Sequence, residues 1–473
     1  MRCSWRELSS RCCRSPWHSS WPRDISSRAY PPPDSSRGRV STKGFQQGSF
    51  RWLLGIEDTS VYPQPGSGMV VLDEFELTGH SLQWREDLLS VARLGATGLR
   101  YGVNWPRVHL APGVFDWSVL DERLELAVND LGLVVIADMV HYGTPTWLDG
   151  SFADPRYPDL VAEFCGAFAE RYRGLVDHMT PLNEPLTTAS FCGLRGVWPP
   201  ALEGWRGWTT VTLAIVEGIR RSVAAVRTAN PDVVIVHVEA ASLYDTPHEH
   251  LSAEVGHLTA VGALPTDLLL GRVGVKHPMW SWLVENGASV AVLEGLLIAP
   301  PTVDLLGVNY YPDLTPRVLR AVGHDVHQHT SNQWTDGLRL VIERFTELYG
   351  LPMLITETSI EADELVRRKW LEESTAQVRE LRREGHDVRG YTWWPLMDFV
   401  DWSYASGGRN VEEFVLDPST TSGSASETYA ERGSSVTPFL RRMGLVSLVE
   451  QVTGVLHRED TLAAAAFETE ARG

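Results

Sequence analysis

The feature that most constrains the fold is a repeated alternation, from about residue 51 onward, of short apolar segments with longer amphipathic ones. The short segments are rich in β-branched and aromatic residues, whereas the longer ones place apolar residues at helical spacing. Strands that alternate with helices build a parallel sheet from βα units. About eight such units in a chain of this length predict one closed (β/α)₈ barrel, a TIM barrel, rather than an open doubly wound sheet.

The predicted elements can be placed along the chain. The strands are Trp52–Glu57, Gly98–Val103, Leu133–Val140, Leu175–Asn183, Val233–Glu239, Val303–Asn309, Pro352–Glu357 and Val388–Trp394. The helices include Leu82–Leu94, Val119–Leu131, Leu160–Tyr172, Val211–Ala229, Gly337–Leu348 and Glu361–Glu384. Residues 247–302 exceed the length of one helix, so we expect an extra helix or a loop folded over the barrel mouth. A helical pattern at Val436–Val449 precedes an Ala-rich acidic tail that we expect to fray.

Composition separates the first 48 residues from the rest. They carry a net charge of +6 in a chain whose total is −18, and Ser, Arg and Pro dominate without apolar periodicity. Such a segment cannot bury enough surface to offset its ordering entropy. We interpret residues 1–48 as a disordered leader or a start codon assigned too far upstream, with an organelle transit peptide as the alternative. Residues 49–450 are then the barrel and residues 451–473 a C-terminal tail.

Charge and cysteine content exclude several classes of partner. A net charge of −18 argues against nucleic acid and against anionic membrane surfaces. No segment approaches the roughly 20 consecutive apolar residues that span a bilayer. The five cysteines are odd in number and lack metal-ligand spacing, so we expect no disulfide framework and a reducing, cytoplasmic location.

Two glutamates, Glu184 and Glu357, each end a predicted strand. The C-terminal ends of barrel strands form one face, where active sites are built. A carboxylate placed there costs solvation energy unless the site uses it. Two carboxyl groups that converge on this face are what cleavage of a glycosidic bond requires. One protonates the leaving oxygen, and the other attacks or stabilises the anomeric carbon.

Six motifs, in the expected order over residues 50–403, resemble those of family 1 glycoside hydrolases of the β-glucosidase type. Thr180–Pro185 resembles the T-x-N-E-P signature that bears the acid/base, and Ile355–Ser359 resembles the I-T-E-N-G signature that bears the nucleophile. The others are Leu99–Arg107, Val140–Tyr142, Gly307–Tyr311 and Trp394–Trp402. The resemblance implies a barrel that cleaves β-glycosides with net retention.

The resemblance assigns roles residue by residue. Glu184 would be the acid/base, which must keep its proton near neutral pH, and Glu357 the ionised nucleophile. The implied substrate contacts are Arg100 and Tyr311 at the nucleophile, Asn183 at the sugar 2-hydroxyl, His141 and Asn309 as further polar contacts, Trp394 and Trp402 as stacking faces, and Asp401 at remote hydroxyls. Two carboxyl groups suffice for this chemistry, so we expect neither metal nor organic cofactor. The alternatives are a structural ion pair for Arg100 and a core histidine for His141.

Several positions depart from the family pattern. Thr358 and Ser359 replace Asn-Gly, Tyr142 replaces Trp, Pro395 replaces Ser, and Asp401 replaces Glu. The family's sugar-binding Gln near the end of the first strand has no clear counterpart, and Glu57, Asp58 and Gln64 are all candidates. These changes cluster where the nonreducing-end sugar is held. We therefore expect retained catalysis with an altered sugar preference.

The sequence thus predicts a retaining β-glycosidase that acts on a small-molecule or oligosaccharide β-glycoside. Two alternatives remain open at this point. One is a transglycosidase built on the same barrel, and the other is a non-catalytic carbohydrate-binding barrel that serves a partner enzyme. The oligomeric state and the sugar are not indicated by the sequence.

Overall fold

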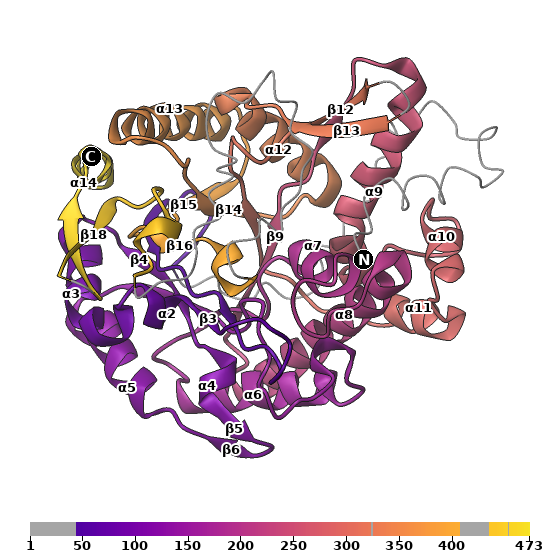
Figure 1. The fold of residues 1–473 in the computed structure, drawn as a ribbon, viewed down its shortest axis with the longest axis horizontal. Helices are drawn as coiled ribbons and strands as arrows, with labels where there is room; N and C mark the ends of the chain where they lie inside the picture. Colours follow the sequence, from indigo (N-terminus) through magenta and orange to yellow (C-terminus); the bar gives the residue numbers. More distant parts are fainter. Residues whose placement is uncertain (1–43, 323–324, 407–434, 453) are drawn as a thin grey trace.

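The computed structural model describes residues 44–322, 325–406, 435–452 and 454–473. Its centre is a closed barrel of eight parallel strands surrounded by helices (Figure 1). The strands are β1 (Arg51–Gly55), β4 (Gly98–Gly102), β7 (Val134–Asp138), β8 (His178–Thr180), β9 (Val234–Ala240), β11 (Leu305–Asn309), β14 (Met353–Thr358) and β15 (Val388–Trp393). Each overlaps one of the eight predicted segments, and β15 pairs with β1 to close the ring. The predicted (β/α)₈ barrel is confirmed.

The helices around the barrel follow the predicted amphipathic segments. They are α3 (His80–Arg93), α5 (Ser118–Glu125), α6 (Tyr157–Arg171), α8 (Gly204–Ala229), α12 (Trp334–Tyr349) and α13 (Glu364–Arg383). Among the described residues, no helix has the length and apolar composition needed to cross a bilayer. Cys165 and Cys192 are buried and unpaired, whereas the other three cysteines lie outside the described residues.

The chain between β9 and β11 makes a larger excursion than any other connection of the barrel. It forms α9 (Ser252–Leu269), α10 (Trp280–Glu285) and α11 (Val290–Leu297), which lie beside α8 (Figure 1). A small sheet of β10 (Tyr244–Asp245), β12 (Arg317–Val322) and β13 (Asp325–Thr330) lies near α9. The predicted extra helix therefore exists, and two shorter ones follow it.

Side chains alternate along the strands between the barrel interior and the helix layer. Leu53, Ile136, Val236 and Leu354 belong to an inner cluster that fills the barrel. Phe45, which lies in the predicted leader, joins this cluster and is fully buried. The predicted domain boundary at residue 48 is therefore too late. Residues 1–43 of the predicted leader lie outside the described residues.

The C-terminal region differs from its prediction. Val436–Val449 is not a helix, because β18 (Val446–Val452) pairs antiparallel with β19 (Val455–Asp460). The tail then continues as helix α14 (Leu462–Arg472), whose Phe467 is fully buried and which packs against α13. Spacing of apolar residues in one segment does not reveal that a second segment will pair with it as a strand. The expected frayed tail is an ordered part of the molecule.

Candidate active site

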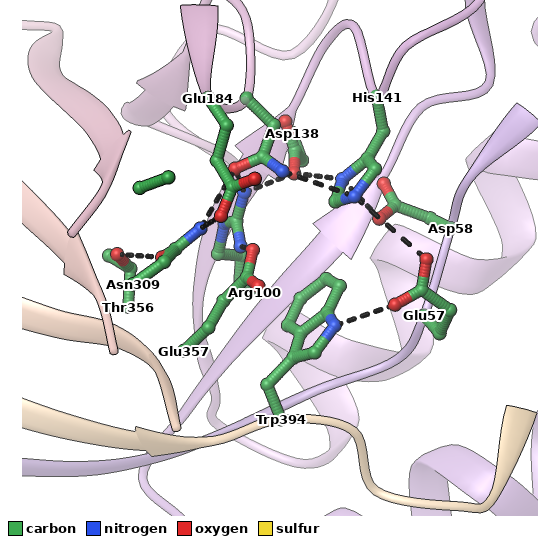
Figure 2. Close-up of polar contacts among 12 residues, drawn as sticks. Glu57, Asp58, Arg100, Asp138, His141, Glu184, Asn309, Thr356, Glu357 and Trp394 are labelled. Carbon is green, nitrogen blue, oxygen red and sulfur yellow. Dashed lines mark hydrogen bonds and ion pairs between the residues drawn. The ribbon is translucent and has the colours of Figure 1, made fainter. Parts of the chain in front are cut away.

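A cavity of about 710 Å³ lies at the C-terminal ends of the barrel strands, within the size range of small-molecule sites. Seven of the ten predicted site residues line it, namely Glu184, Glu357, His141, Asn309, Tyr311, Trp394 and Trp402. Arg100 and Asn183 lie one layer deeper and hydrogen-bond to lining residues. Asp401 does not line the cavity. The two predicted catalytic glutamates therefore share one cavity (Figure 2).

Glu357 turns into the cavity because of an irregularity in β14. The register against β11 pairs Ile355 with Val308 but Glu357 with Asn309, which leaves Thr356 as an extra residue. A bulge of this kind changes the direction of the side chains that follow it. Since Leu354 faces the barrel interior, regular alternation would send Glu357 toward the helices.

The Glu357 carboxyl group receives one charged and one neutral donor. Arg100 Nη1 donates to Oε1, and the Tyr311 hydroxyl donates to Oε2 at 2.7 Å. Burial raises the pKa of Glu357 to about 8, Arg100 opposes this rise, and repulsion from Glu184 adds to it. The group therefore keeps a proton to higher pH than an exposed glutamate does.

Glu184 receives two neutral donors instead. Asn309 Nδ2 donates to Oε1 and the Tyr142 hydroxyl donates to Oε2, both at 2.7 Å. The residue has a left-handed backbone, with φ +45° and ψ +71°. A residue other than glycine pays about 1–3 kcal/mol for such a conformation, so the surrounding structure must hold it there.

Arg100 joins the ends of β4, β7 and β14 beneath the cavity. It is fully buried, and its Nη2 donates to Asp138 Oδ2 and to Asn183 Oδ1, the latter at 2.7 Å. Burial by itself lowers the pKa of Arg100, but the charges of Asp138 and Glu357 outweigh this and raise it. The same guanidinium contacts Asp138 and Glu357, so the ion-pair interpretation and the site interpretation do not exclude each other.

His141 is fixed through one ring nitrogen. Its Nδ1 lies 2.8 Å from Asp58 Oδ1 and 2.9 Å from Asp138 Oδ2. Burial by itself lowers the pKa of His141, but the two aspartates raise it well above its ordinary value. Burial also raises the pKa of Asp58 to about 7. These charges hold the imidazole at the cavity wall, where it stacks parallel to Trp394 at a centroid distance of 5.6 Å.

The same three residues are the buried group with metal-ligand geometry in the described part of the chain. Ligand atoms of Asp58, Asp138 and His141 all lie within 4.8 Å of one another. The aspartates already have cationic partners, because His141 contacts both and Arg100 pairs with Asp138. A divalent cation would have to share this space with two positive side chains, so the donor set fits an ion-pair network better than a metal site.

The position at the end of the first strand, for which the sequence left three candidates, is filled by Glu57. Its Oε2 accepts from Trp394 Nε1 at 2.8 Å, and its Oε1 lies 3.9 Å from His141 Nε2 (Figure 2). Asp58 lies behind the cavity wall against His141, and Gln64 donates to a backbone carbonyl beyond β7. Of the three, Glu57 alone lines the cavity among the described residues.

Trp394 covers the floor of the cavity because β1 has a glycine beneath it. A Cβ atom on Gly55 would lie 1.8 Å from the Trp394 ring, so no larger residue fits there. The guanidinium carbon of Arg100 lies 4.7 Å from the ring centroid, a cation–π distance. The indole therefore sits between the charged floor and the space for a ligand.

Asp401 and Trp402 follow β16 (Phe399–Val400) and behave differently. The Trp402 ring lines the cavity, and its buried Nε1 has no hydrogen-bond partner among the described residues. Asp401 instead accepts from the Ser403 backbone at 2.8 Å and lies 3.9 Å from Arg441. Its assignment as a sugar contact stays a prediction.

Two site residues were not singled out from the sequence. Tyr142, which directly follows His141, was noted only as a departure from the family pattern, yet it donates to Glu184. Asp138 lies inside a predicted strand, where it looked like part of an apolar run. Its position two residues after Ile136, which faces the barrel interior, was the available signal, because a buried carboxylate there needs a cation.

The outer part of the cavity is formed by helices rather than by strand ends. Trp205 and Trp208 of α8 and Leu258 and Val261 of α9 contribute apolar surface. Residues 247–302 thus border the mouth, as expected.

Comparison with solved structures places this architecture among known folds. The family 1 β-glucosidase from Thermotoga maritima aligns with a TM-score of 0.70 over 90% of this chain and 97% of that chain, at 17% identity. The chain has the fold of family 1 β-glucosidases. A structure of the same enzyme with glucoimidazole gives a TM-score of 0.72 over 90% of this chain and 98% of that chain, also at 17% identity.

Curated sequences show the same resemblance at low identity. The bifunctional beta-D-glucosidase/beta-D-fucosidase of Bifidobacterium breve is 23% identical over 441 residues, which cover 78% of this chain and 92% of that protein. The chloroplastic galactolipid galactosyltransferase of Arabidopsis thaliana is 24% identical over 341 residues, 66% of this chain and 50% of that protein. No sequence model of a protein family matches the chain. The resemblance to family 1 glycoside hydrolases is confirmed by these similarities.

Proposed function

We propose that this protein is a retaining β-glycosidase in which Glu357 is the nucleophile and Glu184 the acid/base. One observation carries the proposal: two buried glutamates line one cavity, and a guanidinium contacts one of them while neutral donors contact the other. The permanent charge of Arg100 stabilises a carboxylate at Glu357. Glu184 contacts two neutral donors, an amide and a phenol, and we assign it the acid/base role.

In the first step, a carboxylate oxygen of Glu357 attacks the anomeric carbon and forms an ester bond. The bond from that carbon to the aglycone oxygen breaks, and this oxygen takes the proton of Glu184. Burial raises the pKa of Tyr311 well above its ordinary value, and the Glu357 charge adds to the rise, so its hydroxyl remains a donor to the nucleophile. The aglycone leaves as a neutral alcohol.

In the second step, water gives a proton to the Glu184 carboxylate and attacks the same carbon. The ester bond to Glu357 breaks, and both glutamates return to their starting states. Two inversions at one carbon leave the product with the configuration of the substrate. Asn183, whose Oδ1 accepts from Arg100 and whose Nδ2 donates to the Tyr142 hydroxyl, is the proposed contact to the sugar 2-hydroxyl.

The proposed substrate is a β-linked glycoside whose sugar lies between Trp394, Trp402 and the polar inner wall. Solved neighbours of this fold hold sugar-like inhibitors such as deoxynojirimycin and glucoimidazole. Glu57 places a carboxylate where the family uses a glutamine, and it occupies the Trp394 donor. We infer from this difference that the preferred sugar differs from that of a simple β-glucosidase.

The deciding experiment is Glu357→Ala with a panel of nitrophenyl glycosides. We expect the variant to lose almost all turnover, because it lacks the carboxylate that is proposed to form the ester. Added azide or formate should restore part of it by attacking in place of the missing carboxylate. Glu343→Gln, a variant of a carboxyl group on α12 outside the cavity, is the matched control. Full activity of Glu357→Ala would remove the nucleophile assignment.

Two further experiments distinguish a hydrolase from the two alternatives, a carbohydrate-binding barrel and a transglycosidase. A fluorosugar or cyclitol-epoxide probe should label the protein covalently at Glu357, whereas a carbohydrate-binding barrel would stay unlabelled. The similarity to a galactosyltransferase favours transglycosylation as the second candidate. Analysis of products with an added sugar acceptor distinguishes it from hydrolysis, since a transglycosidase would release new glycosides in place of the free sugar.

A further inference from the structure

Glu239 is a buried carboxyl group next to the candidate active site but outside its cavity. It lies near the end of β9, where Val234, Val236 and Val238 face the barrel interior, so alternation directs Glu239 toward the helix layer. The side chain is 2% exposed and does not line the cavity. The proposed reaction leaves it without a role.

The hydrogen bonds of Glu239 connect β9 to the segment that carries Glu184. Its Oε1 accepts from the backbone nitrogen of Ala240 at 2.9 Å and from that of Leu186 at 3.2 Å. Immediately before Glu239, the carbonyl of Val238 accepts from the Glu184 backbone nitrogen at 3.2 Å. The end of β9 thus forms hydrogen bonds with the chain on both sides of Pro185.

This segment needs such support. Glu184 has the left-handed backbone described above, and Pro185 has no N–H with which to secure it. Helix α7 (Pro185–Ala189) begins there and continues only as the π-helix Ser190–Leu194, and a helical segment this short has little stability without outside contacts. Loss of the bond to Leu186 would free the backbone that aims Glu184 at the cavity.

The protonation state of Glu239 suits this role. Burial raises the pKa of Glu239 well above its ordinary value, and the charge of Glu184 adds to the rise. Its Oε2 is shielded from solvent and has no hydrogen-bond partner among the described residues, so no donor would stabilise a negative charge on this oxygen. A neutral Glu239 adds no negative charge beside Glu184, which itself becomes a carboxylate when it gives up its proton in the first step.

We propose that Glu239 is a positioning residue, which holds the Glu184 carboxyl group over the leaving oxygen by fixing the backbone of residues 184–186. The inference rests on the proposed function, because it gives Glu184 the task of protonating that oxygen. The requirement is for an acceptor of correct length at Leu186. Gln meets this requirement, whereas Ala removes the acceptor and Asp is one methylene too short.

The test compares leaving groups in Glu239→Ala, Glu239→Asp and Glu239→Gln. Misplacing a general acid slows substrates with poor leaving groups by up to about 10²–10⁴-fold, since these need the proton most. We expect kcat/KM for an alkyl glycoside to fall at least about tenfold in the Ala and Asp variants. We expect kcat/KM for the 2,4-dinitrophenyl glycoside to change by less than about threefold, because its leaving group departs without a proton. Glu239→Gln should match the unaltered protein with both substrates.

Other results would overturn the inference. Equal losses with both substrates would indicate a general structural role, and unchanged kinetics in the Ala and Asp variants would indicate none. If Glu239→Gln is as slow as Glu239→Ala, then turnover does not depend on the hydrogen bond that residue 239 accepts from the Leu186 backbone. Glu217→Ala, which alters a carboxyl group on α8 outside the cavity, is the control for local disturbance, and circular dichroism reports folding of each variant. If Glu239→Ala does not fold, the Asp and Gln pair decides the question.

Failure of the proposed function gives a different pattern. In that case the unaltered protein would turn over neither glycoside and would not be labelled by the fluorosugar probe. Failure of the present inference leaves turnover and labelling intact and removes only the dependence on leaving group.

Discussion

The inner and outer parts of the cavity are built in different ways. The inner wall consists of charged and amide side chains at strand ends, and Arg100, Asn183 and His141 each contact at least two others. The outer wall consists of apolar side chains on α8 and α9, such as Trp205 and Val261. Rigid strands fix the groups that would do chemistry, whereas the long excursion after β9 shapes the surface that would meet the aglycone. The comparison predicts that substitutions in the inner wall reduce turnover of every substrate by a large factor. Substitutions in the outer wall should have smaller effects that depend on the aglycone.

The largest effect is expected for Arg100→Lys. A lysine ammonium is a point charge and cannot reproduce the fork that reaches Glu357, Asp138 and Asn183 together. We expect kcat/KM for a 2,4-dinitrophenyl glycoside to fall by about 10²–10³-fold, the typical cost of losing one oriented donor. Arg339→Lys, at an exposed ion pair on α12, is the control. A loss below about tenfold would mean that turnover does not depend on the three contacts that the Arg100 guanidinium makes.

A smaller effect is expected in the pH dependence of Glu184→Gln. The nucleophile must be ionised, so the raised pKa of Glu357 makes kcat/KM of the unaltered protein increase with pH toward about 8. Wherever Glu184 is ionised, its charge raises the pKa of Glu357, and a neutral Gln at this position removes that repulsion and lowers the pKa of Glu357. We expect the acid limb, measured with a 2,4-dinitrophenyl glycoside, to move to lower pH by about one unit, or about 1.4 kcal/mol.

The control for this pH profile is a second variant, measured with the same substrate. Glu254→Gln alters a carboxyl group at the outer wall and should leave the acid limb where it is. An acid limb unchanged in Glu184→Gln would show that the two inner glutamates do not influence each other's protonation.

The smallest and most selective effect is expected for Val261→Trp. The larger side chain fills the outer part of the cavity, so kcat/KM for a glycoside with a bulky apolar aglycone should fall about tenfold. A glycosyl fluoride has almost no aglycone, and its kcat/KM should stay within about twofold. Val292→Trp, at a half-exposed position on α11, is the control. Equal losses with both substrates would contradict the division of the cavity into two parts.

The sequence predicts the barrel well because its signals are local. Each strand and helix has its own periodicity, and Glu184 and Glu357 could be placed at strand ends without knowledge of distant contacts. The direction of Glu357 could not be predicted, since it depends on the bulge at Thr356, which is visible only in the pairing of β11 with β14. Alternation alone would have pointed this side chain away from the cavity.

One choice that the sequence left open and two wrong predictions have a common physical cause, because they concern contacts between segments far apart in the sequence. Choosing Glu57 over Asp58 and Gln64 required the position of the Trp394 indole, more than 300 residues later. Val436–Val449 was predicted as a helix because its partner strand, β19, is not apparent from its own residues. Phe45 was assigned to the leader because its burial depends on strands from across the barrel.

The hairpin of β18 and β19 has a practical consequence for anyone who shortens this protein. Arg458 of β19 forms an ion pair at 2.9 Å with Asp87 of α3, a carboxylate that is only 2% exposed. Helix α14 packs against α13 of the seventh barrel unit, whereas β19 contacts α3 of the first unit. The C-terminal residues therefore connect these two units where β15 pairs with β1. A chain that ends at residue 445 would lose the cation that pairs with Asp87 and the contacts that connect the first and seventh barrel units. Expression designs should therefore retain the chain to Arg472.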